Sequence, residues 1–223
     1  MPQYQSETSK HRDTLLPFCR GYGLDIGFGG DPVSVNAIRL DFPEPYAQTG
    51  SAAVQLGGDC RHLFWFQDDV LDFVYSSHVL EDFAESETLP IITEWARVLR
   101  PGGHLVLLLP DQQRYLRHCE RENARYNEHH SIDHFSLRYV TEVAGLHGNL
   151  EAVAAFPELG EYSFGVVFKK TRPTAQDADQ LVAARRQLEE AYRQRDAVQL
   201  RMNRIQMNPA YRLARSIYRR IAH

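Results

Sequence analysis

Six short apolar runs constrain the fold of this 223-residue chain more than any other feature. Several are apolar at successive positions rather than at alternate ones, which is typical of strands covered on both faces. Segments of helical or turn-forming composition separate them. This alternation predicts an α/β fold with a doubly wound, mostly parallel sheet. The predicted strands span residues 22–27, 37–42, 53–56, 70–76, 104–109 and 162–169.

Two helices are expected beside this sheet. Residues 1–20 predict a lead-in helix, and residues 88–99 predict a helix with one apolar face. The motif RPGG at residues 100–103 ends the second helix, and the next strand follows at once. The apolar face of the second helix consists of Leu89, Ile92, Trp95, Ala96 and Leu99.

The composition changes after Lys170, which predicts a domain over residues 1–172, a linker over 173–179 and a helical tail over 180–223. Residues 180–206 contain no Gly or Pro and carry a weak heptad pattern. This pattern favours a coiled-coil-like helix that forms a homodimer or docks on a partner enzyme. Residues 210–223 are amphipathic and arginine-rich, which suits either an anionic membrane surface or packing against the domain.

Charge and cysteine content limit the class of protein. The net charge is −4, so no overall basic field points to nucleic acid. The three cysteines, Cys19, Cys60 and Cys119, have no zinc-like spacing and indicate reduced thiols in the cytoplasm. The N-terminus has no signal-peptide pattern, and the longest apolar run, residues 105–109, is too short to span a bilayer. We therefore expect a cytoplasmic protein, with residues 210–223 as a candidate contact to the inner face of the membrane.

The segment GLDIGFGG at residues 23–30 predicts a ligand site at the end of the first strand. Gly27 and Gly29 allow positive φ angles and a close approach of backbone to ligand. Asp25 suits a cationic ligand and disfavours a pyrophosphate. The glycine spacing is also not GxGxxG, so a nicotinamide oxidoreductase is disfavoured. The alternative is that Asp25 only caps a turn.

The next strand ends carry further candidate ligand residues. Asp41 ends the second strand, where an acid can bind both hydroxyls of a ribose. Asp59 and the backbone of Cys60 follow the third strand, where they could read an adenine. Ser76 ends the fourth strand and His78 follows it, where His78 either packs at the strand end or lines the pocket.

Together these motifs resemble those of the class I S-adenosylmethionine-dependent methyltransferases, over about residues 21–110. Asp25, Gly27 and Gly29 match the first motif of that family. Residues 72–83 resemble its FDxVxSxxVLEH stretch, and residues 96–103 resemble its RVLKPGG stretch. The resemblance implies a seven-stranded, Rossmann-like sheet and S-adenosylmethionine as methyl donor. It also implies that Asp41 binds the ribose and that Asp59 and Cys60 bind the adenine.

Two departures from the family pattern lie at the glycine turn. Phe28 replaces a small residue or cysteine, and Asp31-Pro32 follows the glycines directly. They predict an altered entry to the first crossover helix, not loss of the site.

The acceptor side is expected after the fifth strand, in residues 110–135. Asp111, His130 and His134 are the catalytic candidates, because imidazoles beside carboxylates supply bases at neutral pH. The alternatives are that these histidines face water, or that the three residues hold a divalent metal. The metal is the less favoured alternative, because the spacing fits no metal motif.

Two short segments carry a second, narrower resemblance. Residues 125–130 resemble the RFNxxHK stretch of methyltransferases from bacterial surface-polysaccharide clusters, and residues 208–215 resemble NPxYRLGR tails of bacterial glycosyltransferases and their neighbours. They favour O-methylation of a sugar hydroxyl in glycan assembly. Two alternatives stay open. One is methylation of a small metabolite such as a lipid, quinone or natural product. The other is a non-catalytic nucleotide-binding scaffold that recruits partners through its tail.

Overall fold

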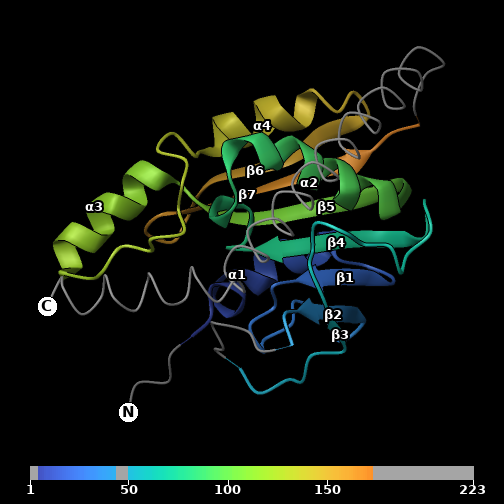
Figure 1. Ribbon diagram of the computed structural model, residues 1–223, viewed down its shortest axis with the longest axis horizontal. Coiled ribbons are helices and arrows are strands. Elements are labelled where there is room, and N and C mark those ends of the chain that lie inside the picture. Colours follow the sequence, from blue (N-terminus) through green and yellow to red (C-terminus); the bar gives the residue numbers. More distant parts are fainter. Residues whose placement is uncertain (1–4, 44–49, 173–223) are drawn as a thin grey trace, which may run out of the picture. The chain divides into compact units, whose positions relative to one another are not determined.

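The computed structural model of the protein describes residues 5–43 and 50–172 (Figure 1). The predicted linker at 173–179 and helical tail at 180–223 lie outside the described residues, so this division of the chain stays a prediction. The described residues form an α/β fold around a seven-stranded, mostly parallel sheet in the order β3-β2-β1-β4-β5-β7-β6. The predicted fold class is confirmed. No helix of these residues is long and apolar enough to cross a membrane.

The first five strands in the sequence run parallel to one another. They are β1 (Gly23–Ile26), β2 (Ala37–Asp41), β3 (Leu56–Gly57), β4 (Leu71–Ser77) and β5 (Leu99–Pro110). The last two strands are β6 (Leu150–Leu159) and β7 (Ser163–Lys170), and β7 lies antiparallel between β5 and β6. Strand β6 is absent from the sequence-based prediction.

Helices cover both faces of the sheet. Helix α1 (Glu7–Leu15) and the 3₁₀ turn η1 (Leu16–Phe18) lie on one face. Helices α2 (Glu85–Val98) and α4 (Leu137–Gly145) lie on the other, where Trp95 and Val140 join the larger core. The 3₁₀ turn η2 (Leu80–Asp82) follows β4, and α3 (Gln112–Glu122) follows β5. Burial on both faces explains the continuous apolar runs of the central strands.

The predicted entry to a first crossover helix is wrong, because residues 27–36 form turns. Helix α1 takes the place of a crossover helix on this face, since Ser6, Ser9 and Arg12 all bind the carboxylate of Asp31. The helix before β1 therefore braces the turn that follows β1.

The carboxyl ends of the parallel strands meet at one edge of the sheet. Ile26 of β1 is in register with Leu40 of β2 and with Ser76 of β4. Asp41 of β2 is in register with Gly57 of β3. The chain moves outward in opposite directions from β1 and β4, and a crevice at such a switch in strand order is where α/β sheets bind ligands.

Candidate active site

The glycine turn after β1 has the backbone conformation that its sequence predicts. Gly27, Gly29 and Gly30 all have positive φ angles, of 65°, 57° and 86°. A Cβ on Gly27 would collide with Val79, and a Cβ on Gly30 would collide with the backbone of Gly50. The turn thus requires glycine both for its dihedral angles and for its packing, and it brings the end of β1 against the residue after His78.

Asp25 lies beneath this turn rather than on its surface. Its side chain is fully buried, and its Oδ2 accepts a hydrogen bond of 2.6 Å from the backbone N–H of Val33. Its Oδ1 has no hydrogen-bond partner among the described residues. Burial raises the pKa of Asp25 to about 8. The carboxyl group therefore ties the glycine turn to the segment that follows it, and the sequence-based expectation of direct contact with a cationic ligand remains a prediction.

Asp41 is a half-buried acid that faces the glycine turn. Its Oδ2 accepts a hydrogen bond from the backbone N–H of Gly29 at 3.3 Å, and its Oδ1 accepts one from Phe42 at 2.8 Å. Burial raises the pKa of this carboxyl, against the effect of those two hydrogen bonds. In the described part of the chain, neither Asp41 nor Asp25 forms a salt bridge. Asp41 is therefore an acid at the edge of the sheet that a ligand can reach without displacing a salt bridge.

Asp59 is held by a neighbouring arginine. Both of its carboxylate oxygens accept hydrogen bonds from the Arg61 guanidinium, which also reaches Glu87 at 3.0 Å. Burial acts to raise the pKa of Asp59, but the hydrogen bonds from Arg61 outweigh it and leave the pKa low. The exocyclic amine of an adenine would have to share this carboxylate with Arg61, a partner that sequence reasoning missed.

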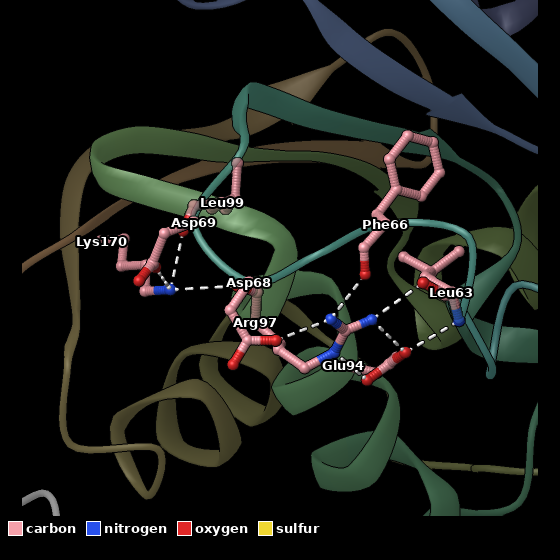
Figure 2. A network of polar contacts seen from close by, with 8 residues as sticks. All are labelled: Leu63, Phe66, Asp68, Asp69, Glu94, Arg97, Leu99 and Lys170. Carbon is pink, nitrogen blue, oxygen red and sulfur yellow. Dashed lines mark hydrogen bonds and ion pairs between the residues drawn. The ribbon is translucent and has the colours of Figure 1, made fainter.

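Cys60 presents backbone rather than a reactive thiol. It is buried, burial raises the pKa of its thiol, and its carbonyl accepts a hydrogen bond of 2.8 Å from the Trp95 indole. The residues after it are anchored by Arg97 of α2, which donates to the carbonyls of Leu63 and Phe66 (Figure 2). The same guanidinium pairs with Glu94 and Asp68. The loop that carries Asp59 and Cys60 is therefore fixed to the helix beneath it.

Ser76 and His78 occupy the end of β4, at the same edge. Ser76 is fully buried, and its hydroxyl lies 3.4 Å from the carbonyl of Ile26. His78 has a left-handed backbone with φ of 55°, and its Nε2 lies 3.0 Å from the Ser163 hydroxyl. Burial lowers the pKa of His78 to about 4, which favours the neutral imidazole. Ser76 supports the neighbouring strand, and His78 belongs to a polar cluster.

His130 is the predicted catalytic residue with the most specific surroundings. Its side chain is 5% exposed, and its Nδ1 lies 2.9 Å from Oε1 of Gln112, the first residue of α3. Its ring lies 4.6 Å from that of Tyr115. Its Nε2 lies 3.9 Å from Oε1 of Glu81 and 3.9 Å from Oδ1 of Asp82. Burial lowers its pKa, so the imidazole is a neutral base at physiological pH.

Glu81 is the residue of this cluster that sequence reasoning missed. It is 2% exposed, and its Oε1 lies between His130 and His78, at 3.9 and 3.5 Å from their nearest nitrogens. Burial, followed by the charge of Asp82, raises its pKa well above the usual value. The sequence VLED after β4 contains Glu81, but the sequence does not show that the turn η2 directs its side chain inward.

The other two predicted catalytic residues, Asp111 and His134, lie outside the cluster around His130. Asp111 caps α3 by accepting a hydrogen bond of 3.0 Å from the backbone N–H of Arg114. His134 is 61% exposed and lies 3.4 Å from Glu85. The structure does not bring these two together with His130 as metal ligands. In the described part of the chain, the group of three side chains close enough for that is His118, Glu122 and Glu161, where Arg121 already pairs with both acids.

Comparison with known proteins agrees with this geometry. Residues 24–107 match a family model described as a methyltransferase domain. No curated protein sequence matches the chain. Among solved structures, a protein from Pyrococcus horikoshii is similar, with 20% identity, a TM-score of 0.57, and coverage of 77% of this chain and 92% of that one. An S-adenosylmethionine-dependent methyltransferase from Thermotoga maritima has 18% identity, a TM-score of 0.55 and coverage of 75% and 90%.

A third solved structure is similar over a comparable length. The N-methyltransferase NodS from Bradyrhizobium japonicum has 16% identity, a TM-score of 0.53 and coverage of 74% of this chain and 97% of that one. At these identities the structures establish the fold, and the family model over residues 24–107 supplies the sequence match. Residues 24–107 therefore match a methyltransferase domain, and the fold around them is the one seen in S-adenosylmethionine-dependent methyltransferases.

Proposed function

We propose that this methyltransferase transfers the methyl group to a hydroxyl oxygen of a sugar, with His130 as the general base. The observation that carries this proposal is the environment of the His130 imidazole. It is buried and oriented by Gln112 through Nδ1, and its Nε2 faces the carboxyl groups of Glu81 and Asp82. A neutral imidazole held in this way is suited to remove a proton from a hydroxyl.

The residues at the sheet edge fit the methyl donor. Among the described residues Asp25 and Asp41 form no salt bridge, and the buried Oδ1 of Asp25 is unsatisfied. Asp41 would bind the ribose hydroxyls. The backbone of the glycine turn would contact the donor directly. The Cys60 backbone and Asp59 would bind the adenine. Bound there, the donor supplies a methyl group that its sulfonium already activates for in-line displacement.

The chemical step then needs orientation and one proton acceptor. The hydroxyl oxygen forms a bond to the methyl carbon while the bond from that carbon to sulfur breaks and its electron pair stays on sulfur. The hydroxyl proton passes to Nε2 of His130 and is later released to water. Glu81 and Asp82 stabilise the imidazolium that forms, in the way that a carboxylate stabilises the histidine base of serine hydrolases.

A sugar acceptor is supported by the polarity of the same region. Asn127 donates to Asp82 at 3.2 Å, and its backbone N–H donates to the Tyr115 hydroxyl at 2.9 Å. Ser131 donates to the carbonyl of Phe83. Polar groups of this kind are suited to a hydroxyl-rich acceptor rather than an apolar one. The short resemblance at residues 125–130 falls on this loop, which adds weight to a glycan.

The test is methyl transfer from radiolabelled donor to three acceptor sets: sugar nucleotides with lipid-linked oligosaccharides, apolar quinones and phenols, and amino sugars with a free amine. Labelled methyl ether in the first set supports the proposal. Transfer to the second set alone replaces the sugar by a small metabolite, and transfer to nitrogen in the third overturns O-methylation. Donor binding with no transfer to any acceptor supports the scaffold alternative.

A further inference from the structure

A chain of polar side chains connects the N-terminal helix to the proposed base. Glu7 of α1 and Ser163 of β7 lie at one end, and His130 lies at the other. His78 and Glu81 lie between them. Four separate parts of the sequence thus contribute to one partly buried cluster, of which the sequence analysis identifies only His78 and His130.

We propose that Glu81 is a positioning residue for His130 and that Glu7 controls it through Ser163 and His78. This inference rests on the proposed function only in taking His130 as the base. The inference adds Glu7 of α1 to the residues that act on the acceptor through His130.

The first step is the unsatisfied carboxyl of Glu81. Its Oε2 is buried with no hydrogen-bond partner among the described residues, and its Oε1 lies between two imidazoles. A buried carboxyl that lacks full hydrogen bonding destabilises the fold. A group of that kind beside two imidazoles is a candidate for function, because such a cost is tolerated most often at functional sites.

The second step is the direction of the hydrogen bonds at the other end. The Ser163 hydroxyl can donate to the Glu7 carboxylate, 3.4 Å away, because a carboxylate only accepts. The serine oxygen then accepts from His78 Nε2 at 3.0 Å. This fixes the proton of neutral His78 on Nε2 and leaves the lone pair of Nδ1 facing Glu81 at 3.5 Å. An ionised Glu7 therefore selects the tautomer of His78.

The third step is proton movement within the cluster. With a lone pair on His78 Nδ1, a protonated Glu81 points its proton toward His78. When His130 gains the proton of the acceptor hydroxyl, the Glu81 proton shifts toward Nδ1 of His78 without leaving Glu81, because His78 has the lower pKa of the two. Glu81 then presents more negative charge to the His130 imidazolium, and the Glu7 carboxylate balances the positive charge that builds on His78. The number of protons is conserved, and no further reactant is needed.

Other charged groups near His78 also affect its pKa. Helix α1 also brings Lys10 and His11, both of which act to lower the pKa of His78, as does His130. Tyr162 packs its ring edge-on against His78 at 5.9 Å. Among these neighbours, Glu7 is the group that acts most strongly to raise the pKa of His78. Removing its charge is therefore the sharpest perturbation.

The experiment compares Glu7→Gln with Asp13→Asn in the full chain. Asp13 is an exposed acid on the same helix, so both variants lose one negative charge from α1. We expect Glu7→Gln to lower kcat about tenfold, less than loss of the base itself, to move the acid limb of the pH–rate profile to lower pH, and to leave KM for the donor unchanged. Glu7→Asp should restore part of kcat. Asp13→Asn should match the wild type in all three measurements.

A second readout does not depend on finding an acceptor. Histidine ¹⁵N correlation spectra of the full chain report which ring nitrogen of His78 carries the proton, with His78→Gln used to assign the signal. The relay predicts the Nε2–H tautomer in the wild type and a mixture in Glu7→Gln. An Nδ1–H tautomer in the wild type, or an unchanged spectrum in Glu7→Gln, would overturn the relay even if methyl transfer is intact. Absence of transfer with the predicted tautomer would instead count against the proposed function alone.

Discussion

The Nε2 atom of His130 lies 3.9 Å from Oε1 of Glu81, in a site where both side chains are almost completely buried. The two residues come from different segments, since Glu81 belongs to the turn η2 after β4 and His130 to the loop after α3. Their proximity distinguishes His130 from the exposed His134, although the sequence presents both as equivalent candidates.

The first prediction concerns these two histidines. His130→Asn should lower kcat by about a hundredfold or more, the usual contribution of a general base, while donor affinity stays unchanged. His134→Asn is the matched control and should retain wild-type turnover, because its side chain faces solvent. Steady-state kinetics with calorimetric donor binding measures both quantities. A loss of turnover in His134→Asn alone would mean that His134, and not His130, is the base.

A second prediction concerns Asp41. Asp41→Asn keeps the shape of the side chain but removes the charged acceptor that we assign to the ribose. Hydrogen bonds to charged groups contribute about 1.5–3 kcal/mol, so donor affinity should fall roughly tenfold to a hundredfold. The melting temperature should stay close to that of the wild type, as should that of the control Asp13→Asn. Equal donor affinity in Asp41→Asn and the wild type by calorimetry would refute the assignment.

Asp25 predicts how stability depends on pH. Its folded-state pKa, about 8, is above that of an unfolded aspartate, so the folded state holds the proton more tightly. Stability from this group is fully present below about pH 4 and is lost as the pH rises toward 8, by at most about 1.4 kcal/mol per pH unit. Asp25→Asn cannot ionise and should remove this decline. Urea unfolding of both proteins between pH 5 and 8 tests it, and parallel pH profiles would contradict the burial of a protonated Asp25.

Arg97 should stabilise the loop between β3 and β4. Arg97→Met leaves the carbonyls of Leu63 and Phe66 and the carboxylate of Glu94 without this partner, and we expect a loss of about 2–4 kcal/mol in the free energy of unfolding. Arg100→Met is the control, since Arg100 is 61% exposed and forms one salt bridge, with Asp72. Similar losses in the two variants would mean that the Arg97 network contributes little.

Much of the sheet and of the glycine turn at the proposed donor site could be predicted from the sequence, because each is encoded locally. Continuous apolar runs predict buried parallel strands, and the glycines after the first run mark a turn with positive φ angles. β6 was missed because it is an edge strand whose side chains are mostly exposed, with a composition that includes three alanines and Pro157. Without burial on two faces, such a strand has no continuous apolar pattern.

The acceptor side was predictable only in part, because its members meet through tertiary structure. His130 was identified by its residue type and its place after the fifth strand. Glu81 was not, since a glutamate in a polar loop carries no sign of burial. Glu7 and Ser163 lie near opposite ends of the described chain, and only the packing of α1 beside β7 brings them to within hydrogen-bonding distance. Asp111 caps α3, a role that the sequence did not reveal because a helix cap and an active-site acid look alike in sequence.

The account depends most on the donor lying at the carboxyl edge of β1, β2 and β3. A crystal structure of the full chain with S-adenosylhomocysteine tests this directly. We predict the ribose hydroxyls at the Asp41 carboxylate, the adenine beside the Cys60 backbone, and the sulfur on the side of the ligand that faces His130. A ligand bound elsewhere, or this edge closed by the chain's own side chains with the ligand excluded, would contradict the account.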